Sequence, residues 1–243
     1  MSERLLPGGS HARLRAMAAE IRAGKPPTDG TVAGLIQQHG ALAVAALLEA
    51  VASERERAEQ VADRRIELVW SGPEVDGAAT RDTAVVLREL FGTATRSVVV
   101  AGFAVYDGES VFEALWERWE AVPDLSIELY LNVGRGEGET DPADVLVSRF
   151  RHRFHQKDWP WPRKPAVYYD PRALAPGYGP RAVLHAKCVV VDDEKAFVTS
   201  ANLTEAAQLR NIEAGVLLHD LPLAARLASQ FRALRDHGQL RAL

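Results

Sequence analysis

The sequence predicts an α/β fold in which helices cover both faces of a mixed β-sheet, preceded by a small helical segment. From about residue 64 onward, apolar runs of strand length alternate with amphipathic helical segments, which is typical of repeated βα units. The run 97–103 is almost continuously apolar, as expected for a strand buried on both faces. Hydrophobic residues make up 47% of the 243 residues, enough for a sizeable core.

Residues 1–63 are assigned to the helical N-terminal segment. Ser10 can cap a first helix, and Gly40 separates two later ones. Ser53 is a candidate cap for a further, charged helix, with Glu56 in the capping-box position. The helices predicted before Ser53 cover residues 10–23, 31–39 and 41–51. This segment is either a small domain of its own or a support packed on the main domain.

Residues 64–243 are assigned to a single catalytic domain. Its strands and helices follow one another without an internal repeat, and the apolar strands favour a mostly parallel or mixed sheet. The predicted strands are 66–70, 97–103, 125–131, 166–170, 188–191, 196–198 and 212–218. The predicted helices are 81–91, 110–121, 141–154 and 223–236.

Polar side chains at fixed spacing surround the predicted hairpin 188–198, whose turn is the polar stretch 192–195. His185 and Lys187 are two residues apart, so on a strand they would face the same side, and so would Ser200 and Asn202. A hairpin would bring all four side chains to its open end. An imidazole, an ammonium group, a hydroxyl and an amide together suit a phosphate, because one group can attack while the others hold the oxygens.

These residues resemble the signature of the phospholipase D superfamily. His185, Lys187, Asp192, Ser200 and Asn202 fit its H-x-K, D and S-x-N positions without insertion. Thr199 stands where the family usually has glycine, a departure at a backbone-packing position. The acidic residue that the family carries downstream corresponds to Glu213. The resemblance implies the family's phospholipase D-like α/β/α sandwich.

The order of elements before the motif extends the resemblance to phospholipase D-like proteins of phage-defence systems. Trp70-Ser71-Gly72-Pro73 and Tyr168-Tyr169-Asp170-Pro171 are part of that order. The resemblance thus implies an antiviral role.

The family's chemistry uses two histidines that face each other across the phosphate, and this chain supplies one matching histidine, His185. An active enzyme of this kind would therefore be a homodimer in which a two-fold axis repeats the site. By resemblance, His185 is the nucleophile that forms a phosphohistidine in one subunit and the general acid and base in the other. Lys187 and Asn202 would hold the non-bridging oxygens, and Ser200 would donate a further hydrogen bond.

The remaining motif residues have supporting roles by the same resemblance. Glu213 would accept a hydrogen bond from the far imidazole nitrogen and fix the histidine tautomer. Asp192 would organise the turn and take no part in proton transfer. Neither a metal nor another cofactor is expected, because two lysines and a protonated histidine supply the positive charge.

A cationic segment favours nucleic acid as the substrate. Between residues 149 and 164 six cations stand against one acid, Asp158, and aromatic residues are interleaved, which suits a single strand. The alternative is a solvated helix face whose aromatic residues pack into the core. The candidate nucleic-acid-binding residues are Arg149, Arg151, Arg153, Lys157, Trp159, Trp161, Arg163, Lys164 and Arg210.

Two other functions remain open from the sequence. The first is a phospholipase or another hydrolase of small phosphodiesters, which would need an exposed apolar loop or an interfacial helix. The second is a non-catalytic nucleic-acid-binding subunit of a defence complex, with other defence subunits as partners. Fold alone does not decide between them.

Composition narrows the setting of the protein. The net charge of −4 excludes a global basic field, so a nucleic acid must meet a local patch. The single cysteine, Cys188, fits a reducing compartment and a place in the core. The sequence contains neither a run apolar enough to span a bilayer nor the pattern of a signal peptide, so we expect a cytoplasmic protein without a membrane partner.

Overall fold

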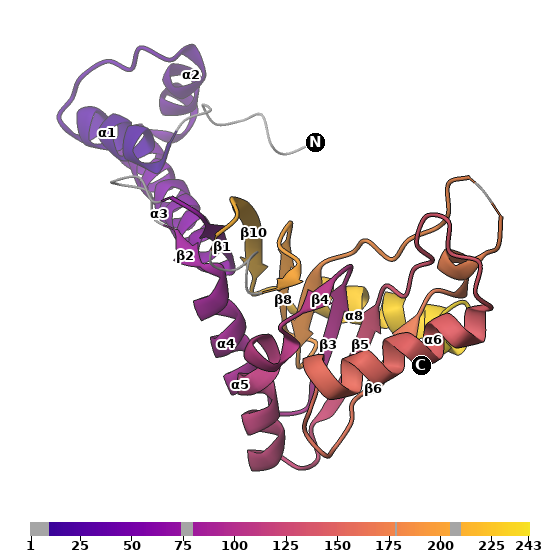
Figure 1. Ribbon diagram of the computed structural model, residues 1–243. Helices are drawn as coiled ribbons and strands as arrows, with labels where there is room; N and C mark the ends of the chain where they lie inside the picture. The colour runs from indigo at the N-terminus through magenta and orange to yellow at the C-terminus, as the bar shows by residue number, and fades with distance from the viewer. Residues whose placement is uncertain (1–9, 74–79, 178, 205–209) are drawn as a thin grey trace. The chain divides into compact units, whose positions relative to one another are not determined.

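The computed structural model describes residues 10–73, 80–177, 179–204 and 210–243, without the side chains of 62–64. The chain divides into two compact units, one ending at Arg64 and the other formed by Arg65–Leu243. Each unit has its own hydrophobic core, and each is described by itself. Figure 1 shows the elements of both.

The first unit consists of the helices α1 (His11–Arg22), α2 (Gly30–His39) and α3 (Ala41–Arg65). Ser10 caps α1 by accepting a hydrogen bond from the backbone of Arg13, as predicted. Asp29 caps α2, accepting from Thr31 N at 2.9 Å. The buried apolar side chains of the three helices meet in one cluster that comprises Leu14, Ala18, Ile21, Val32, Val44, Ala45, Leu48 and Ala52.

The helix α3 corrects the prediction for Ser53. The sequence predicts a helix over 41–51 and a separate helix capped by Ser53, whereas α3 runs unbroken from Ala41 to Arg65. No glycine or proline lies between these two ends. An interior serine costs only a few tenths of a kcal/mol of helix propensity (about 0.5), so a capping residue does not end a helix by itself.

In the second unit, nine strands of the described residues form one mixed sheet in the order β11-β6-β5-β3-β7-β8-β10-β1-β2. β3, β5 and β6 run parallel, whereas β7, β8, β10 and β1 join the sheet in antiparallel pairs. The mixed sheet is therefore as predicted. The strands are β1 (Ile66–Ser71), β2 (Arg81–Asp82), β3 (Ser97–Gly102), β5 (Ser126–Leu131), β6 (Ala166–Tyr169), β7 (Cys188–Val191), β8 (Lys195–Thr199), β10 (Glu213–Leu218) and β11 (Arg241–Ala242).

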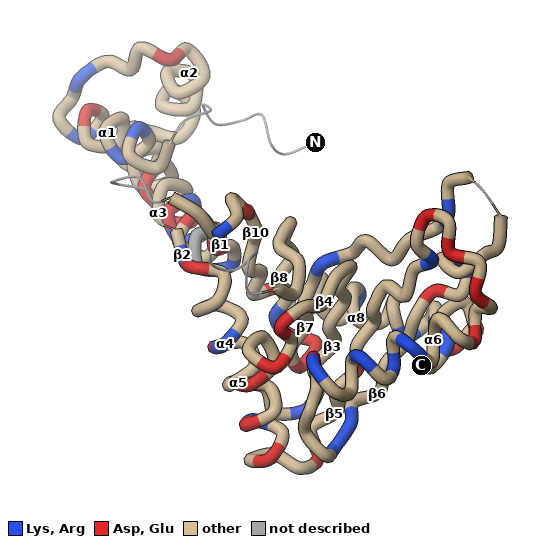
Figure 2. The backbone as a smooth tube through the Cα atoms, viewed as in Figure 1, with Lys and Arg blue, Asp and Glu red and all other residues tan. Residues whose placement is uncertain are grey.

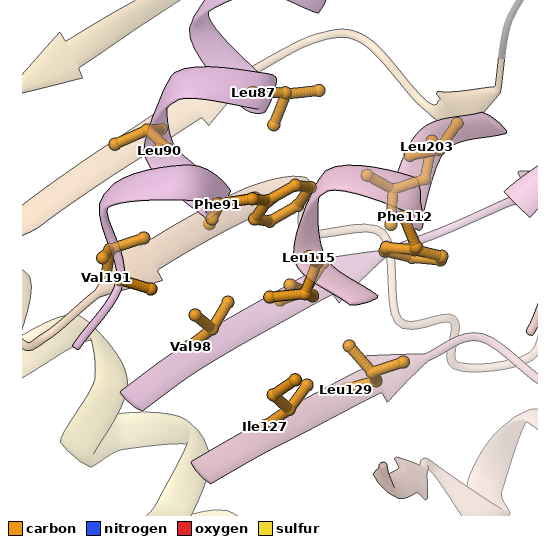
Figure 3. Close-up of a cluster of buried hydrophobic side chains, with 14 of the residues drawn as sticks. Leu87, Leu90, Phe91, Val98, Phe112, Leu115, Ile127, Leu129, Val191 and Leu203 are labelled. Atoms are coloured by element: carbon orange, nitrogen blue, oxygen red, sulfur yellow. The ribbon is translucent and has the colours of Figure 1, made fainter. Parts of the chain in front are cut away.

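Helices cover both faces of the sheet. α4 (Thr83–Thr93) and α5 (Gly108–Ala121) pack on the face that carries Val98 and Val100, and Figure 3 shows Phe91 and Leu115 over Val98. α8 (Leu221–Asp236) packs on the opposite face, against Val99 and Ala101. Successive residues of β3 thus point to opposite cores, which explains its continuous apolar run.

The other elements lie around the end of the sheet that carries the motif. α6 (Ala143–Arg153) continues into a π-helical turn, Phe154–Asp158, and a 3-10 helix covers Pro171–Leu174. A small parallel sheet joins β4 (Val105–Tyr106) to β9 (Leu203–Thr204). No pattern in the sequence indicates this sheet, because each of its strands has only two residues. None of the described helices combines the length and apolarity needed to cross a membrane.

Candidate functional site

Four of the motif residues lie at the open end of the predicted hairpin, which the structure forms from β7 and β8. His185 and Lys187 precede β7, and Ser200 and Asn202 follow β8. The expectation that they lie within strands is therefore wrong, because the pairing of β7 with β3 ends at Ala101 and Cys188. One further backbone hydrogen bond, from Thr199 N to Lys187 O at 3.1 Å, keeps the two segments together.

The side chains of His185 and Lys187 are in direct contact. The Nζ atom of Lys187 lies 3.4 Å from each imidazole nitrogen of His185 and 3.1 Å from its carbonyl oxygen. His185 is exposed and Lys187 is half-buried. An imidazole and an ammonium group thus lie side by side at the surface, where one phosphate group can reach both.

Phe103, predicted from the sequence only as the end of a strand, lies beside His185. Its ring centroid lies 4.8 Å from that of His185, and Lys187 Nζ lies 5.6 Å from it. The antiparallel register of β3 and β7, in which Ala101 faces Cys188, brings Phe103 to this place. The sequence offers no sign of that register, because the two strands are far apart along the chain.

Glu213 contacts Ser200 in place of His185. Its carboxylate accepts a hydrogen bond from Ser200 Oγ and another from Asn211 Nδ2 at 3.3 Å. Across the part of the chain that the structure describes, no hydrogen bond joins Glu213 to His185. β8 lies between the two segments that carry them, which separates those segments by about 10 Å. The expected hydrogen bond between Glu213 and His185 is therefore not formed among the described residues.

Asn202 lies between the hairpin and the small sheet. Its Oδ1 atom is buried and has no hydrogen-bond partner among the described residues, which is unusual for a buried acceptor. The next residue, Leu203, pairs with Val105 in β4. A Cβ atom on Gly102 would lie 2.6 Å from Leu203 Cδ1, so glycine at this position allows β9 to approach the end of β3.

Asp192 anchors the turn of the hairpin to the start of β3. Its carboxylate accepts hydrogen bonds from the backbone of Thr95, Arg96 and Ser97 and from the Thr95 hydroxyl. Burial raises the pKa of Asp192, but these hydrogen bonds outweigh it, so the pKa lies below its usual value. Asp192 thus fixes β7 and β8 from the end opposite to His185.

The predicted nucleic-acid-binding residues do not form one free surface. Arg149 is exposed but pairs with Glu139 and Asp141, and Figure 2 shows acidic residues beside the cations around α6. Arg153 lies 3.2 Å from the buried Asp158. Lys164 donates to Trp159 O at 2.8 Å. Arg151, Lys157, Arg163 and Arg210 are exposed.

The prediction that Trp159 stacks on a base is wrong. Trp159 is fully buried in the main core, and its indole nitrogen donates to Arg163 O at 2.8 Å. Trp161 is half-buried and stacks on Trp116 with a ring separation of 5.6 Å. The guanidinium of Arg163 lies 4.0 Å from the ring centre of Trp119. The alternative, in which the aromatic residues pack into the core, describes this segment better.

The motif lies within a segment that matches a known protein family. Residues 161–235, which include every motif position, match the family described as "Cardiolipin synthase, PLD-like domain". The DISARM protein DrmC of Bacillus paralicheniformis is 29% identical over 161 residues. That match covers 66% of this chain and 59% of DrmC, so the chain spans under two thirds of the relative's length.

Solved structures of similar fold include NucT from Helicobacter pylori and Nuc, a phospholipase D family member from Salmonella typhimurium. NucT is 14% identical, with a TM-score of 0.49 over 73% of this chain and 99% of NucT. Nuc is 16% identical, with a TM-score of 0.45 over 73% of this chain and 97% of Nuc. On the family match and the motif that it contains, the chain carries a phospholipase D-like segment at residues 161–235, and it resembles DrmC.

Proposed function

We propose that this protein is a metal-independent phosphodiesterase that cleaves DNA or RNA in antiphage defence. The observation that carries the proposal is the contact between His185 and Lys187, on the segment whose hairpin partner continues into Ser200 and Asn202. These are the groups that a phosphoryl transfer through a histidine requires. The match to the DISARM protein DrmC supports the defence role.

The reaction would proceed in two displacements. An imidazole nitrogen of His185 attacks phosphorus, and the leaving oxygen departs with a proton from the partner subunit's His185. The partner subunit's His185 then takes a proton from water, whose oxygen displaces the histidine from phosphorus. Lys187 supplies positive charge to the non-bridging oxygens in both steps, and the amide of Asn202 donates a hydrogen bond to them.

The proposal requires two copies of the chain around one phosphate, because each copy brings one motif histidine. A C2 axis through the site would repeat His185, Lys187 and Asn202. The symmetry also allows either histidine to act first. This shared site makes the dimer a testable part of the mechanism.

The first experiment measures cleavage of single- and double-stranded DNA and RNA, and of bis(p-nitrophenyl) phosphate, in the presence of EDTA. The wild type is compared with His185→Ala, and with His237→Ala as a control at an exposed histidine that follows α8 as its C-cap. We expect cleavage by the wild type and the control, and none by His185→Ala. Turnover of phospholipid vesicles alone would favour the phospholipase. Binding of nucleic acid without any cleavage would favour the non-catalytic subunit.

A second experiment tests the shared site by mixing wild type and His185→Ala in varying ratios after subunit exchange. If each site needs both histidines, activity falls as the square of the wild-type fraction. If one chain suffices, activity falls linearly. Light scattering under the same conditions gives the mass of the active species.

A further inference from the structure

A pocket of about 450 Å³ opens at the carboxyl ends of β3 and β5. The residues that line it include three aromatic ones, Phe103, Tyr106 and Phe150, together with Asn132 and Arg153. Its size falls within the range of small-molecule sites, about 300–1,000 Å³. Its residues come from three separate segments, 103–106, 131–136 and 150–153, which no local sequence pattern brings together.

Three contacts tie the pocket to the motif. Phe103 forms part of the pocket wall and also touches the imidazole of His185, at 4.8 Å between ring centres. Asn132 Oδ1 accepts a hydrogen bond from the backbone of Leu184 at 3.2 Å. Tyr106 pairs with Thr204 in the strand that follows Asn202. A group bound in the pocket would therefore lie next to a phosphate held at His185.

The pocket offers stacking surfaces and positive charge. The guanidinium of Arg153 lies 5.4 Å from the ring centre of Tyr106 and 5.2 Å from that of Phe150. Arg153 also contacts Val105 O and Asp158, at 3.2 Å in each case, so its position is fixed. Arg135 adds a second cation to the wall, and no acidic side chain is among the described residues that line it. Aromatic rings beside arginine are suited to stack on nucleobases near a phosphate.

We propose that this pocket receives the base of the nucleotide next to the scissile phosphate. This inference rests on the proposed function and narrows its substrate. A base in the pocket has left its helical stack and its pairing partner, so single-stranded nucleic acid is the preferred substrate. The two arginines and the asparagine of the wall suit an acyl chain poorly, because the chain would bury their polar groups without hydrogen-bond partners.

Tyr106 is the best side chain to test, because it is 58% exposed, it lines the pocket, and its ring lies beside the guanidinium of Arg153. Calorimetric titration with thymidylyl-thymidine is compared with titration by the same dinucleotide lacking both bases. Titrations use the full chain with His185→Ala, so that no ligand is cleaved. The His185→Ala protein that retains Tyr106 should bind the intact dinucleotide roughly ten- to a hundredfold more tightly than the abasic one.

The ratio of these two affinities decides the inference. Tyr106→Ala should bring the ratio close to one, whereas Tyr106→Phe, which keeps the ring, should preserve it. Val145→Ala, at an exposed apolar side chain of α6 outside the pocket, should leave the ratio at its starting value. An unchanged ratio in Tyr106→Ala, or no preference for bases at the outset, would overturn the inference. Binding of phosphatidylglycerol vesicles that depends on Tyr106, without dinucleotide binding, would overturn it in favour of lipid.

Failure of the pocket and failure of the proposed function can be told apart. Cleavage of bis(p-nitrophenyl) phosphate by the protein with an intact His185 reports on the chemistry, while the titration reports on the pocket. Cleavage of that diester with an unchanged ratio in Tyr106→Ala would remove the pocket inference alone. A base preference that depends on Tyr106, in a protein that cleaves no diester, would support the pocket and contradict the phosphodiesterase.

Discussion

The ring of Phe103 lies against the imidazole of His185, with centroids 4.8 Å apart and planes inclined by 55°. This contact limits how the exposed histidine can turn, and a nucleophile loses rate when it is misplaced. We predict that Phe103→Ala lowers kcat for bis(p-nitrophenyl) phosphate by roughly ten- to a hundredfold with little change in KM. Steady-state kinetics measure kcat and KM, and thermal unfolding of the same variant measures its stability.

Phe103→Tyr separates positioning from general packing, because it keeps the ring and its contact with His185. It should recover most of the lost kcat. A Phe103→Ala variant with wild-type kcat, or one whose loss is explained by unfolding, would show that Phe103 does not position the histidine.

Asp192 should make the stability of the fold sensitive to acid. Its pKa lies below its usual value in the folded protein, so its stabilising contribution is complete above the unfolded value of about 3.9 and is lost as the pH falls through the folded value. Asp192→Asn should lower the free energy of unfolding by about 1–3 kcal/mol at pH 7. The difference from wild type should shrink in acid.

Denaturant titrations between pH 7 and pH 3 measure this difference, with Glu194→Gln as the control. Glu194 lies in the same turn and is exposed, with a surface ion pair to Arg96. Such a pair contributes about 0–1 kcal/mol, so its loss should be small at every pH. An Asp192→Asn effect that is equally large at pH 7 and pH 3 would exclude the carboxylate as its cause.

The contact between Glu213 and Ser200 predicts that these side chains act as one unit. Ser200→Ala and Glu213→Gln should each lower kcat/KM for bis(p-nitrophenyl) phosphate, and the double variant should lose no more than the worse single variant. The double-mutant cycle should give a coupling free energy of about 1 kcal/mol. Asn211→Ala is a matched control, because it removes the other hydrogen bond to Glu213.

A direct action of Glu213 on His185 would give a different pattern. The two substitutions would then be additive, and Glu213→Gln would shift the pH dependence of kcat/KM while Ser200→Ala would not. That outcome would mean that the histidine acquires its acidic partner only when substrate or a second copy is present.

Local patterns predict much of this fold, and contacts between distant segments explain what they miss. The run 97–103 indicates a buried strand, and the turn at 192–195 indicates a hairpin; both are present as β3 and the β7–β8 pair. Fixed spacing also finds His185 and Lys187. The position of Phe103 beside His185 and the position of the pocket depend on which strands are neighbours in the sheet. The pattern of a single segment does not predict that order.

The cationic segment shows that local sequence patterns also fail to predict which surface residues are free to bind a ligand. The alternation of cations and aromatic residues between 149 and 164 is equally compatible with a binding surface and with a packed turn. The π-helical turn at Phe154–Asp158 leads directly into the buried Trp159. Periodicity does not predict such a turn, because it breaks the regular helical repeat.

Ser53 and Asp29 provide a final test of helix capping. The sequence predicts an N-cap at Ser53, whereas in the structure Ser53 lies inside a helix and Asp29 is an N-cap. Ser53 lies inside α3, where alanine is the better helix former, so Ser53→Ala should be neutral or stabilise by up to about 0.5 kcal/mol. Asp29 accepts hydrogen bonds from Thr31 N and Val32 N, so Asp29→Ala should cost about 1 kcal/mol. Denaturant unfolding followed by circular dichroism at a helix wavelength measures both variants. A loss of about 1 kcal/mol in Ser53→Ala would mean that α3 is two helices, with Ser53 capping the second.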